Sequence, residues 1–308
     1  MKEGSVLIVG SVNMDLVLSC SHVPNAGETI LGDKYVTVPG GKGANQAIAV
    51  AKSRGNGYFL GCIGNDTNGL KLKNELKDAN LNLDYLQVSQ SNNTGLAVIM
   101  LDNSGQNRII VYSGANMDIT KDNIDKAFEK HFDCVLLQFE VAEEIVVYTC
   151  NLALEKNIPV IVDAGPSMDF PLERIKGITV ISPNETETYT LTGILPSTDE
   201  LACEAAKILV NRCSAKYVVI KRGAQGAYVF GQGISQVVPT PKVKVVDTTA
   251  AGDAFTGAFT TNFIKTGDVL QATQFGVIAG ALAVSKFGAQ PSIPTYEEIV
   301  SFANTNEY

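Results

Sequence analysis

The sequence predicts an α/β fold: a doubly wound, mostly parallel central sheet with helices on both faces. Two observations predict it. Short β-branched runs alternate along the chain with helical patterns, and this repetition is typical of such layered sheets. The runs are apolar throughout, as strands buried on both faces are. The 308 residues would fill one large α/β domain or two smaller ones, and we expect a single domain over residues 1–308.

The composition narrows the class of protein. A hydrophobic content of 45% allows a sizeable core, and a net charge of −8 argues against a nucleic-acid partner, because phosphate backbones attract positive surfaces. The six cysteines include no C-x-x-C pair, so neither a zinc site nor a disulfide framework is indicated. No apolar run approaches the ~18 residues of a membrane span. We therefore expect a soluble, cytoplasmic protein with no membrane partner.

The expected elements can be placed along the chain. A helix should run from about Ala44 to a stop at Gly55, because glycine is favoured just after a helix end. Another should start at Ser197, where "STDE" reads as a capping box with Glu200. A third should include Asp253, which apolar residues follow at helical spacing. The expected strands of the central sheet are residues 5–10, 134–138, 159–163, 178–182 and 216–221.

Two stretches do not fit the alternation of strands and helices. Residues 29–38 have strand-forming content, and residues 94–113 resemble a hairpin around the turn "DNSG". A hairpin inserted into an α/β chain is unsuited to a parallel sheet. We therefore expect a small separate β-sheet, a lid with strands from about 14–38 and 94–113. One of its faces should be buried against a ligand site or a second subunit.

Polar residues follow nearly every expected strand of the central sheet. In an open parallel sheet, ligands bind beyond the carboxyl ends of the strands, so a site is expected at this edge. The polar residues just past the strands are Asn13, Asp15, Glu140, Asp163, Asn184, Glu187, Lys221 and Arg222.

A glycine-rich stretch, "PGGKGANQA" at 39–47, precedes the first expected helix. Glycines let the backbone approach a ligand closely. The stretch is not a Walker A loop, because Gly43 stands where Ser or Thr should follow the lysine, and no G-x-G-x-x-G follows a strand. The alternative is a tight loop that only starts a helix.

The stretch "DTTAAGDAF" at 247–255 places small residues directly before Asp253. Residues 250–253 should form the first turn of a helix, whose unpaired N–H groups and dipole attract an anion. A carboxylate beside them can accept a proton from a hydroxyl during phosphoryl transfer. The alternative is an acid that only stabilises the helix end, by roughly 0.3–1 kcal/mol. With two histidines in the chain and no triad pattern, hydrolytic chemistry is not indicated.

These motifs resemble, nearly end to end, the ribokinase family of carbohydrate kinases. The similar segments are "GSVNMD" (10–15), "GGKGANQA" (40–47), "SPNETE" (182–187), "VDTTAAGDAFTGAF" (246–259) and "KFGAQPSIP" (286–294). The resemblance implies an ATP-dependent kinase that phosphorylates D-ribose at O5 to give D-ribose 5-phosphate. Two alternatives remain: a kinase of the same family for deoxyribose, fructose or a nucleoside, and a catalytically silent sugar-binding protein.

The resemblance also implies roles for individual residues. Asp253 would be the catalytic base, with the N–H groups of Ala250, Ala251 and Gly252 holding the transferring phosphoryl group. The sugar would be bound by Asn13, Met14, Asp15, Gly41, Lys42, Gly43, Ala44, Asn45, Glu140 and Asp253. ATP would be bound by Asn184, Glu187, Lys221, Arg222, Gly223, Ala224, Gln225, Gly226, Gly252, Asp253 and Val277.

Two metal ions are implied in the same way. Glu187 would organise Mg²⁺ through water, and K⁺ would lie among Asp247, Thr249, Ala283, Lys286, Gly288 and Ser292. The lid would build the interface of a homodimer. The sequence departs from the family pattern at Lys221, where threonine is frequent, and at "DAGPS" (163–167), where N-P-A-P is common. Val277 stands where the family often has a polar residue, so it would contact adenine through apolar groups alone.

Overall fold

A computed structural model describes residues 4–103 and 107–305. Its main sheet has the strand order β13-β12-β11-β10-β9-β8-β1-β4-β5. The pairs from β11 across to β5 are parallel, and β12 and β13 are antiparallel additions at one edge. The strands are β1 (Ser5–Val9), β4 (Asn56–Gly64), β5 (Asn82–Ser89), β8 (Cys134–Leu137), β9 (Val160–Asp163), β10 (Val180–Ser182), β11 (Tyr217–Lys221), β12 (Ala227–Gly231) and β13 (Ile234–Val238). The prediction of a mostly parallel sheet is confirmed, and each of the five predicted strands is present.

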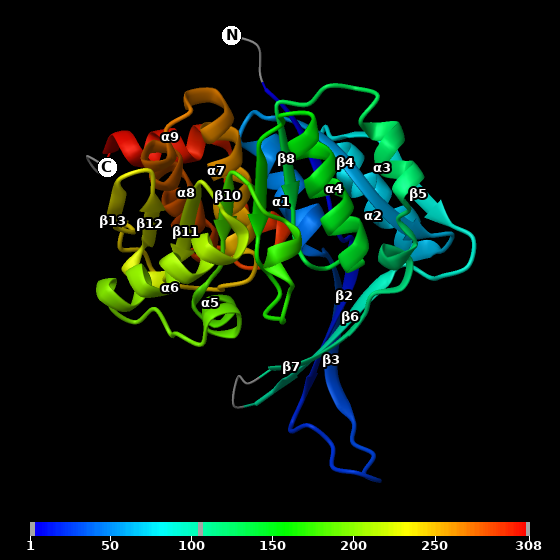
Figure 1. Ribbon diagram of the computed structural model, residues 1–308. Helices are drawn as coiled ribbons and strands as arrows, with labels where there is room; N and C mark the ends of the chain where they lie inside the picture. Colours follow the sequence, from blue (N-terminus) through cyan, green and yellow to red (C-terminus); the bar gives the residue numbers. More distant parts are fainter. Residues whose placement is uncertain (1–3, 104–106, 306–308) are drawn as a thin grey trace.

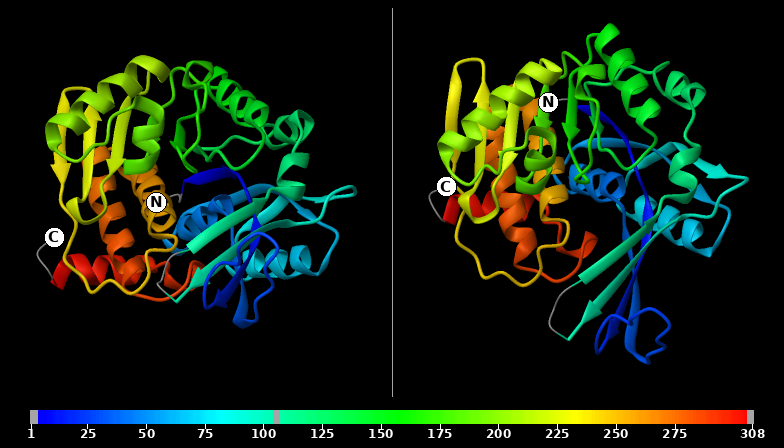
Figure 2. Two further views of the ribbon diagram at one scale, coloured as in Figure 1. Left: turned by 90° about the horizontal axis from the view of Figure 1, so that it is seen from below. Right: turned by 60° about the horizontal axis from the view of Figure 1, so that its bottom comes forward.

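Helices cover both faces of this sheet, as predicted (Figures 1 and 2). The helices are α1 (Lys42–Lys52), α2 (Thr67–Asp78), α3 (Lys121–Ala127), α4 (Glu143–Glu155), α5 (Glu185–Thr192), α6 (Asp199–Cys213), α7 (Ala251–Thr266), α8 (Val269–Val284) and α9 (Tyr296–Thr305). Short 3-10 turns are η1 (Gly114–Asp118), η2 (Leu172–Arg174), η3 (Gly223–Gln225) and η4 (Gln290–Ser292). Within the described ranges, no helix combines the length and the apolar character that a membrane span needs.

Alternate residues of the central strands supply two hydrophobic cores. In β1, Leu7 and Val9 pack in the core that α4 and α6 cover, whereas Val6 and Ile8 pack in the core of α1, α7 and α8. Side chains of a strand point alternately to the two faces, so a strand between two helical layers must be apolar at every position. This explains the continuous apolar runs in the sequence.

Two predicted helix starts need correction. The helix predicted from Ala44 begins at Lys42, with Gly41 as its N-cap, and it ends at Lys52, before Gly55. The N-cap of α6 is Thr198 and not Ser197. Thr198 has extended backbone angles, and its hydroxyl accepts a hydrogen bond from the N–H of Leu201 at 3.3 Å. The cap therefore lies one residue later than predicted, and Glu200 is not at the third helical position that a capping box requires.

A small second sheet projects from the body of the molecule (Figure 1). Its strand order is β3-β2-β6-β7, formed by β2 (Asn13–Cys20), β3 (Gly32–Gly40), β6 (Gly95–Asp102) and β7 (Asn107–Tyr112). The central pair, β2 and β6, is parallel, and β6 and β7 form the predicted antiparallel hairpin. The turn predicted at 102–105 lies partly outside the described residues. The predicted separate sheet is confirmed. It joins the body of the molecule at the start of β2, the strand that follows β1 in the chain.

Candidate active site

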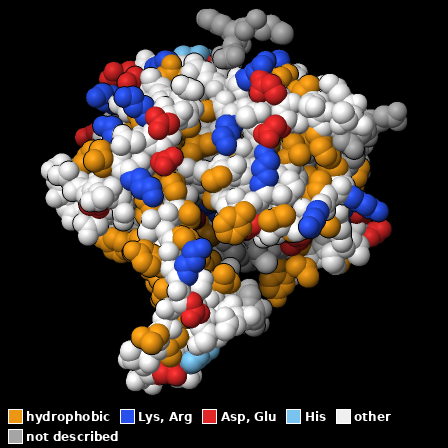
Figure 3. Space-filling model, turned by 180° about the vertical axis from the view of Figure 1, so that it is seen from behind, with side chains coloured by type: hydrophobic (Ala, Val, Ile, Leu, Met, Phe, Trp, Pro, Cys, Tyr) orange, Lys and Arg blue, Asp and Glu red, His pale blue; other side chains and the backbone are white. Residues whose placement is uncertain are grey.

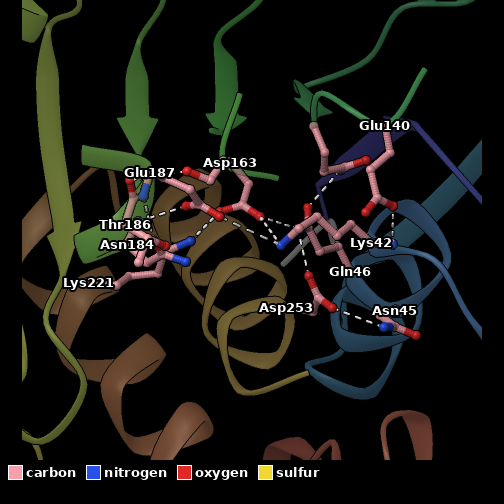
Figure 4. Close-up of polar contacts among 12 residues, drawn as sticks. Lys42, Asn45, Gln46, Glu140, Asp163, Asn184, Thr186, Glu187, Lys221 and Asp253 are labelled. Atoms are coloured by element: carbon pink, nitrogen blue, oxygen red, sulfur yellow. Dashed lines mark hydrogen bonds and ion pairs between the residues drawn. The ribbon is translucent and has the colours of Figure 1, made fainter. Parts of the chain in front are cut away.

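Charged and amide side chains from distant parts of the chain gather beyond the carboxyl ends of the parallel strands (Figure 4). Asp163 is the last residue of β9, and Lys221 is the last residue of β11. Glu140 follows β8, and Asn184 caps α5 after β10. The strands are parallel and in register, so residues that follow them meet at one edge, as the sequence predicted.

Asp253 lies at the centre of this group, in the first turn of α7. The helix starts at Ala251 because Ala250 adopts a left-handed conformation, with a φ of 58°. The carboxylate of Asp253 is buried and accepts hydrogen bonds from Asn45 Nδ2 at 2.9 Å and from Gln46 Nε2 at 3.0 Å. Burial raises its pKa to about 6, although the nearby Lys42 opposes the rise. The group is therefore mainly ionised at neutral pH, yet it is basic enough to accept a proton.

A second carboxylate, Asp163, lies on the other side of Gln46. It accepts a hydrogen bond from Gln46 Nε2 at 2.7 Å and forms an ion pair with Lys221. The Nζ atom of Lys42 lies 3.7 Å from its Oδ2 atom. Complete burial alone would raise the pKa of Asp163, but Lys221 and Lys42 reverse the effect and hold the pKa below its usual range.

Glu187 and Asn184 form a capping box at the start of α5. Asn184 Oδ1 accepts from the N–H of Glu187 at 2.9 Å, and Glu187 Oε2 accepts from the N–H of Asn184 at 2.7 Å. The other oxygen of Glu187 lies 3.9 Å from Lys42 Nζ. Burial raises the pKa of Glu187, although Lys221 and Lys42 oppose it. The box holds one carboxylate oxygen and turns the other toward the site.

The glycine loop brings the start of α1 against the end of β1. Gly41 has a φ of 89°, a conformation that favours glycine. A side chain at Gly43 would place its Cβ 2.6 Å from the backbone of Gly10 and Ser11. Because Gly43 has no side chain, the loop packs closely against Gly10 and Ser11. The N–H of Lys42 donates to Glu140 Oε2 at 3.0 Å, and Ser11 Oγ donates to the same oxygen at 2.5 Å.

The first residues of β2 form the part of the site next to the small sheet. Asp15 is partly buried, and burial, Glu140 and Asp253 together raise its pKa to about 7. Asn13 Oδ1 accepts a hydrogen bond from Asn116 Nδ2 at 2.6 Å. Met14, between them, is 1% exposed and packs in the core. Alternate residues of the strand therefore face the site and the core.

A cavity of about 560 Å³ opens beside the first turn of α7. The predicted residues that line it are Lys221, Gly223, Ala224, Gly226, Ala251, Gly252 and Val277. The rest of the lining is not predicted from the sequence: Thr240, Pro241, Lys242, Val243, Val245, Thr248, Phe255, Gly280, Ala281 and Val284. These residues are mostly small or apolar, and no polar pattern in the sequence distinguishes them from core and loop residues.

Five residues predicted to bind nucleotide do not line this cavity: Glu187 and Asp253, described above, and Arg222, Gln225 and Asn184. Arg222 is 3% exposed, and its guanidinium pairs with Asp199 at 2.7 Å. Gln225 is exposed and donates to the carbonyl of Ser197 at 3.5 Å. The Oδ1 atom of Asn184 is used in the cap of α5.

The residues predicted to surround potassium lie on two segments that Asp247 joins. Its carboxylate accepts from the N–H of Thr249 at 2.9 Å and from the N–H of Gly288 at 2.9 Å. The side chain of Lys286 pairs with Glu298 at 2.5 Å, so its backbone is the part that can take part in a site. Ser292 donates its hydroxyl to the carbonyl of Ala289 at 2.7 Å, and Ala283 lies at the end of α8.

Two glutamines at the centre of the site were also missed. Gln46 links the two carboxylates described above, and Gln138 donates to Gln46 Oε1 at 2.7 Å. Gln46 stands next to Asn45 in the glycine motif, which was the available signal. Gln138 ends an expected strand and carries no signal of its own.

Comparison with known proteins places this geometry in a family. The chain matches the pfkB family of carbohydrate kinases over residues 3–296. It is 33% identical to a ribokinase of Haemophilus influenzae over 97% of this chain and 98% of the relative, and 30% identical to a deoxyribokinase of Salmonella typhi over 98% and 99%. The structure of Arabidopsis thaliana ribokinase complexed with ribose and ATP matches with a TM-score of 0.88 and 34% identity, covering 98% of each chain. The chain therefore belongs to the pfkB family of carbohydrate kinases.

Proposed function

We propose that the protein is an ATP-dependent ribokinase, which transfers a phosphoryl group from ATP to O5 of D-ribose. The buried carboxylate of Asp253 carries this proposal. It lies in the first turn of α7, between a cluster of polar side chains and a cavity large enough to hold much of a nucleotide. The similarity to ribokinases over nearly the full length supports the choice of sugar.

Asp253 would act as the general base. Its pKa of about 6 leaves it ionised at neutral pH, and it can take the proton of the sugar hydroxyl as that oxygen attacks phosphorus. The first turn of α7 offers N–H groups to the charge that develops on the phosphoryl oxygens. The N–H of Gly252 is well suited, whereas that of Ala251 already donates to the carbonyl of Thr248 at 3.3 Å.

The sugar would lie between the glycine loop and the start of β2. Asp15 and Glu140 offer carboxylate oxygens to a pair of hydroxyls, and Asn13 and Asn45 offer amide groups. The Nδ2 of Asn45 donates to Asp253, and its Oδ1 accepts from Gln290 at 3.2 Å. Asn45 would thereby orient the base as well as border the sugar.

ATP would occupy the cavity, with its phosphates toward Lys221 and Gly252 and its base toward Val277. Among the described residues, no group of three or more His, Cys, Asp and Glu side chains is placed to hold a metal. The site therefore fits Mg²⁺ that is held mainly by phosphates and water, with Glu187 ordering the water. When bound, Mg²⁺ would neutralise charge on the phosphates.

A potassium ion would fit beside the loop that precedes α7. The donors there are oxygens: the carboxylate of Asp247, the hydroxyls of Thr249 and Ser292, and the carbonyls near Ala283, Lys286 and Gly288. Asp247 already ties this loop to Gly288, so a cation bound there would steady the turn that starts α7.

The alternative acceptors are deoxyribose, fructose or a nucleoside, and the relative named deoxyribokinase supports the first of them. A silent sugar-binding protein is disfavoured, because it would not need an intact Asp253 beside the cavity. The test is kcat/KM for ribose, 2-deoxyribose and adenosine under one set of conditions. We expect ribose to exceed 2-deoxyribose by a factor on the order of 10–10³, because a missing hydroxyl leaves a polar partner unpaired but water can fill the gap. The assignment fails if deoxyribose or adenosine equals or exceeds ribose.

The protein would form a homodimer through the small sheet. Strand β7 exposes Ile109, Ile110, Val111 and Tyr112 by 49–63%, and Tyr35 of β3 is 68% exposed. Hydrophobic side chains are visible on the projection and along its junction with the body (Figure 3). An apolar edge strand of this kind needs a cover. Light scattering should give a dimer mass for the wild type and a monomer mass for Ile110→Asp. A monomeric wild type would contradict the proposal.

We also propose a cytoplasmic location. All six cysteines are free, and five of them are buried, which fits a reducing compartment.

A further inference from the structure

Gln46 occupies an unusual position between two buried carboxylates. It is fully buried in α1, and its single Nε2 group donates both to Asp163 Oδ2 at 2.7 Å and to Asp253 Oδ1 at 3.0 Å. Two ionised groups this close would repel each other across an empty gap. The amide hydrogens fill that gap with partial positive charge, and they connect the proposed base in α7 to a second acid at the end of β9 (Figure 4).

The orientation of this amide is fixed by Gln138. Gln138 follows β8, is fully buried, and donates its Nε2 to Gln46 Oε1 at 2.7 Å. A flipped Gln46 would present its oxygen to two carboxylates and its hydrogens to another donor. Gly10 leaves the room that Gln138 needs, since a Cβ there would lie 2.0 Å from Gln138 Oε1. The two carboxylates and Gln138 therefore hold the Gln46 amide in one orientation, whereas the Oε1 atom of Gln138 is buried without a hydrogen-bond partner.

We propose that Gln46, oriented by Gln138, is a positioning residue that sets the geometry and the ionisation of Asp253 and ties it to Asp163. This inference rests on the proposed kinase function, in which Asp253 is the base. Through Asp163 the link continues to Lys221, which lines the cavity. The base and the nucleotide cavity thus share one hydrogen-bonded chain: Lys221, Asp163, Gln46 and Asp253.

The charged groups around Asp253 set the electrostatic background on which the Gln46 hydrogen bond changes the pKa of Asp253. Lys42 at the start of α1 lowers the pKa of Asp253, and Asp163 from β9 raises it. Asp15 from β2 interacts electrostatically with Asp253 across the sugar space. The other charged groups act on the neighbours of Asp253: Glu140 acts on Asp15, Glu187 on Lys42, and Lys221 on Asp163. Loss of the Gln46 hydrogen bond removes a group that favours the ionised base, so the pKa of Asp253 should rise above about 6.

The first test is the pH dependence of kcat at saturating substrates in Gln46→Met, which keeps the size of the side chain. We expect the acidic limb to move up by about one pH unit, as loss of a hydrogen bond to a charged group produces. Activity should fall about fivefold relative to the wild type at pH 6 and largely recover at pH 8.5. A merely structural role would lower kcat by the same factor at every pH, and superimposable limbs would overturn the proposal.

Two further variants give the sign of the effect, and a third is a control. Gln138→Met should move the limb in the same direction by a smaller amount, because Gln46 is left in place but is less firmly held. Asp163→Asn removes the facing negative charge and should move the limb down. Thr149→Val is the control, because Thr149 is equally buried in α4 and bonds only within its own helix, to the carbonyl of Ile145. A Thr149→Val limb that moved as far as the others would contradict the account.

A measurement without turnover separates this inference from the kinase assignment. NMR titration of carboxyl-labelled aspartate gives the pKa of Asp253 directly in the wild type, in Gln46→Met and in Gln138→Met, with Asp253→Asn to assign the signal. A higher pKa in the glutamine variants supports the link even if the acceptor is not ribose. An unchanged pKa in both variants overturns the link even if the wild type phosphorylates ribose. If Gln46→Met does not fold, Gln138→Met and Asp163→Asn decide the matter.

Discussion

The two ends of the site are built in different ways. Around Asp253, polar side chains from α1, from the ends of β9 and β11 and from Gln138 after β8 hold one another by hydrogen bonds and ion pairs. The neighbouring cavity is lined mainly by small and apolar residues of α7, α8 and the loop at 240–248. Hydrogen bonds fix the orientation of the side chains around Asp253, whereas the shape of the apolar lining defines the cavity. Under the proposed function, chemistry belongs to the polar end and nucleotide recognition to the cavity, and variants of the two ends test that division.

Asp253→Asn should have the largest effect. The amide keeps the shape of the side chain but cannot accept the proton, and loss of a general base lowers the rate by a factor of roughly 10²–10⁴. The measurement is ADP release with saturating ribose and ATP. A kcat within a fewfold range of the wild type would remove Asp253 from the mechanism.

Gly252→Ala and Gly43→Ala should distinguish a glycine that leaves room for the transferring phosphoryl group from a glycine that allows close packing of the backbone. A Cβ at Gly252 would meet only Lys221 Nζ, at 3.9 Å, whereas a Cβ at Gly43 would lie 2.6 Å from backbone atoms. Gly252→Ala should therefore gain roughly 0.5–1 kcal/mol of stability in its helix but lose activity by about 10²-fold, because the methyl group displaces the phosphoryl group. Gly43→Ala should unfold more easily by about 1–3 kcal/mol.

Thermal unfolding and ADP release, measured on both glycine variants, check this contrast. A destabilised Gly252→Ala, or a fully active one, would show that the first turn of α7 does not border the transferring group.

Asp247→Ala tests the loop that joins the two ends. The carboxylate ties residues 247–249 to Gly288, and we propose that it also borders a potassium ion. Potassium should stimulate the wild type over tetramethylammonium, on the order of the 5–150-fold typical of coupled sites, and the variant should lose most of that response. Equal rates of the wild type in the two cations would argue against a cation site.

Asp15→Asn should change the stability of the protein in a way that depends on pH. Burial raises the pKa of Asp15 from 3.8 to about 7, so between these pH values the folded protein binds more protons than the unfolded chain does. Its contribution to the free energy of unfolding is present below about pH 4 and is lost as the pH rises to about 7. The asparagine variant lacks this loss and should be more stable at pH 8, by about 1–3 kcal/mol.

Thermal unfolding of Asp15→Asn and the wild type at pH 4.5 and pH 8 gives the comparison. A variant that is less stable than the wild type at pH 8 would contradict the inference that burial of the ionised Asp15 carboxylate destabilises the folded protein.

The contrast between the two ends also explains what the sequence could predict. Asp163 and Lys221 end apolar strands, and parallel topology brings strand ends together, so their gathering followed from chain order alone. Asp253 stood behind small residues at a helix start, which is a local signal. The bridge through Gln46 joins residues more than two hundred positions apart, and no local pattern reports such a contact.

The cavity was harder to predict for a different physical reason. Ala281, Gly280 and Val284 face it from α8, but small and apolar side chains at helical spacing equally suit a packed core. Arg222 was misleading, because its polar character suggested the site whereas its guanidinium is buried against Asp199. The N-cap of α6, Thr198, differed from the predicted Ser197 because serine and threonine, side by side, are both good caps.

The most direct test of the division between the two ends is calorimetric titration of Asp253→Asn with ribose and, separately, with a non-hydrolysable ATP analogue. The account predicts that both ligands bind with dissociation constants within about threefold of the wild type, since equal binding with lost turnover marks a group that acts in the transition state. Loss of ribose or nucleotide binding in proportion to the loss of turnover would contradict it, because Asp253 would then hold a ligand and not move a proton.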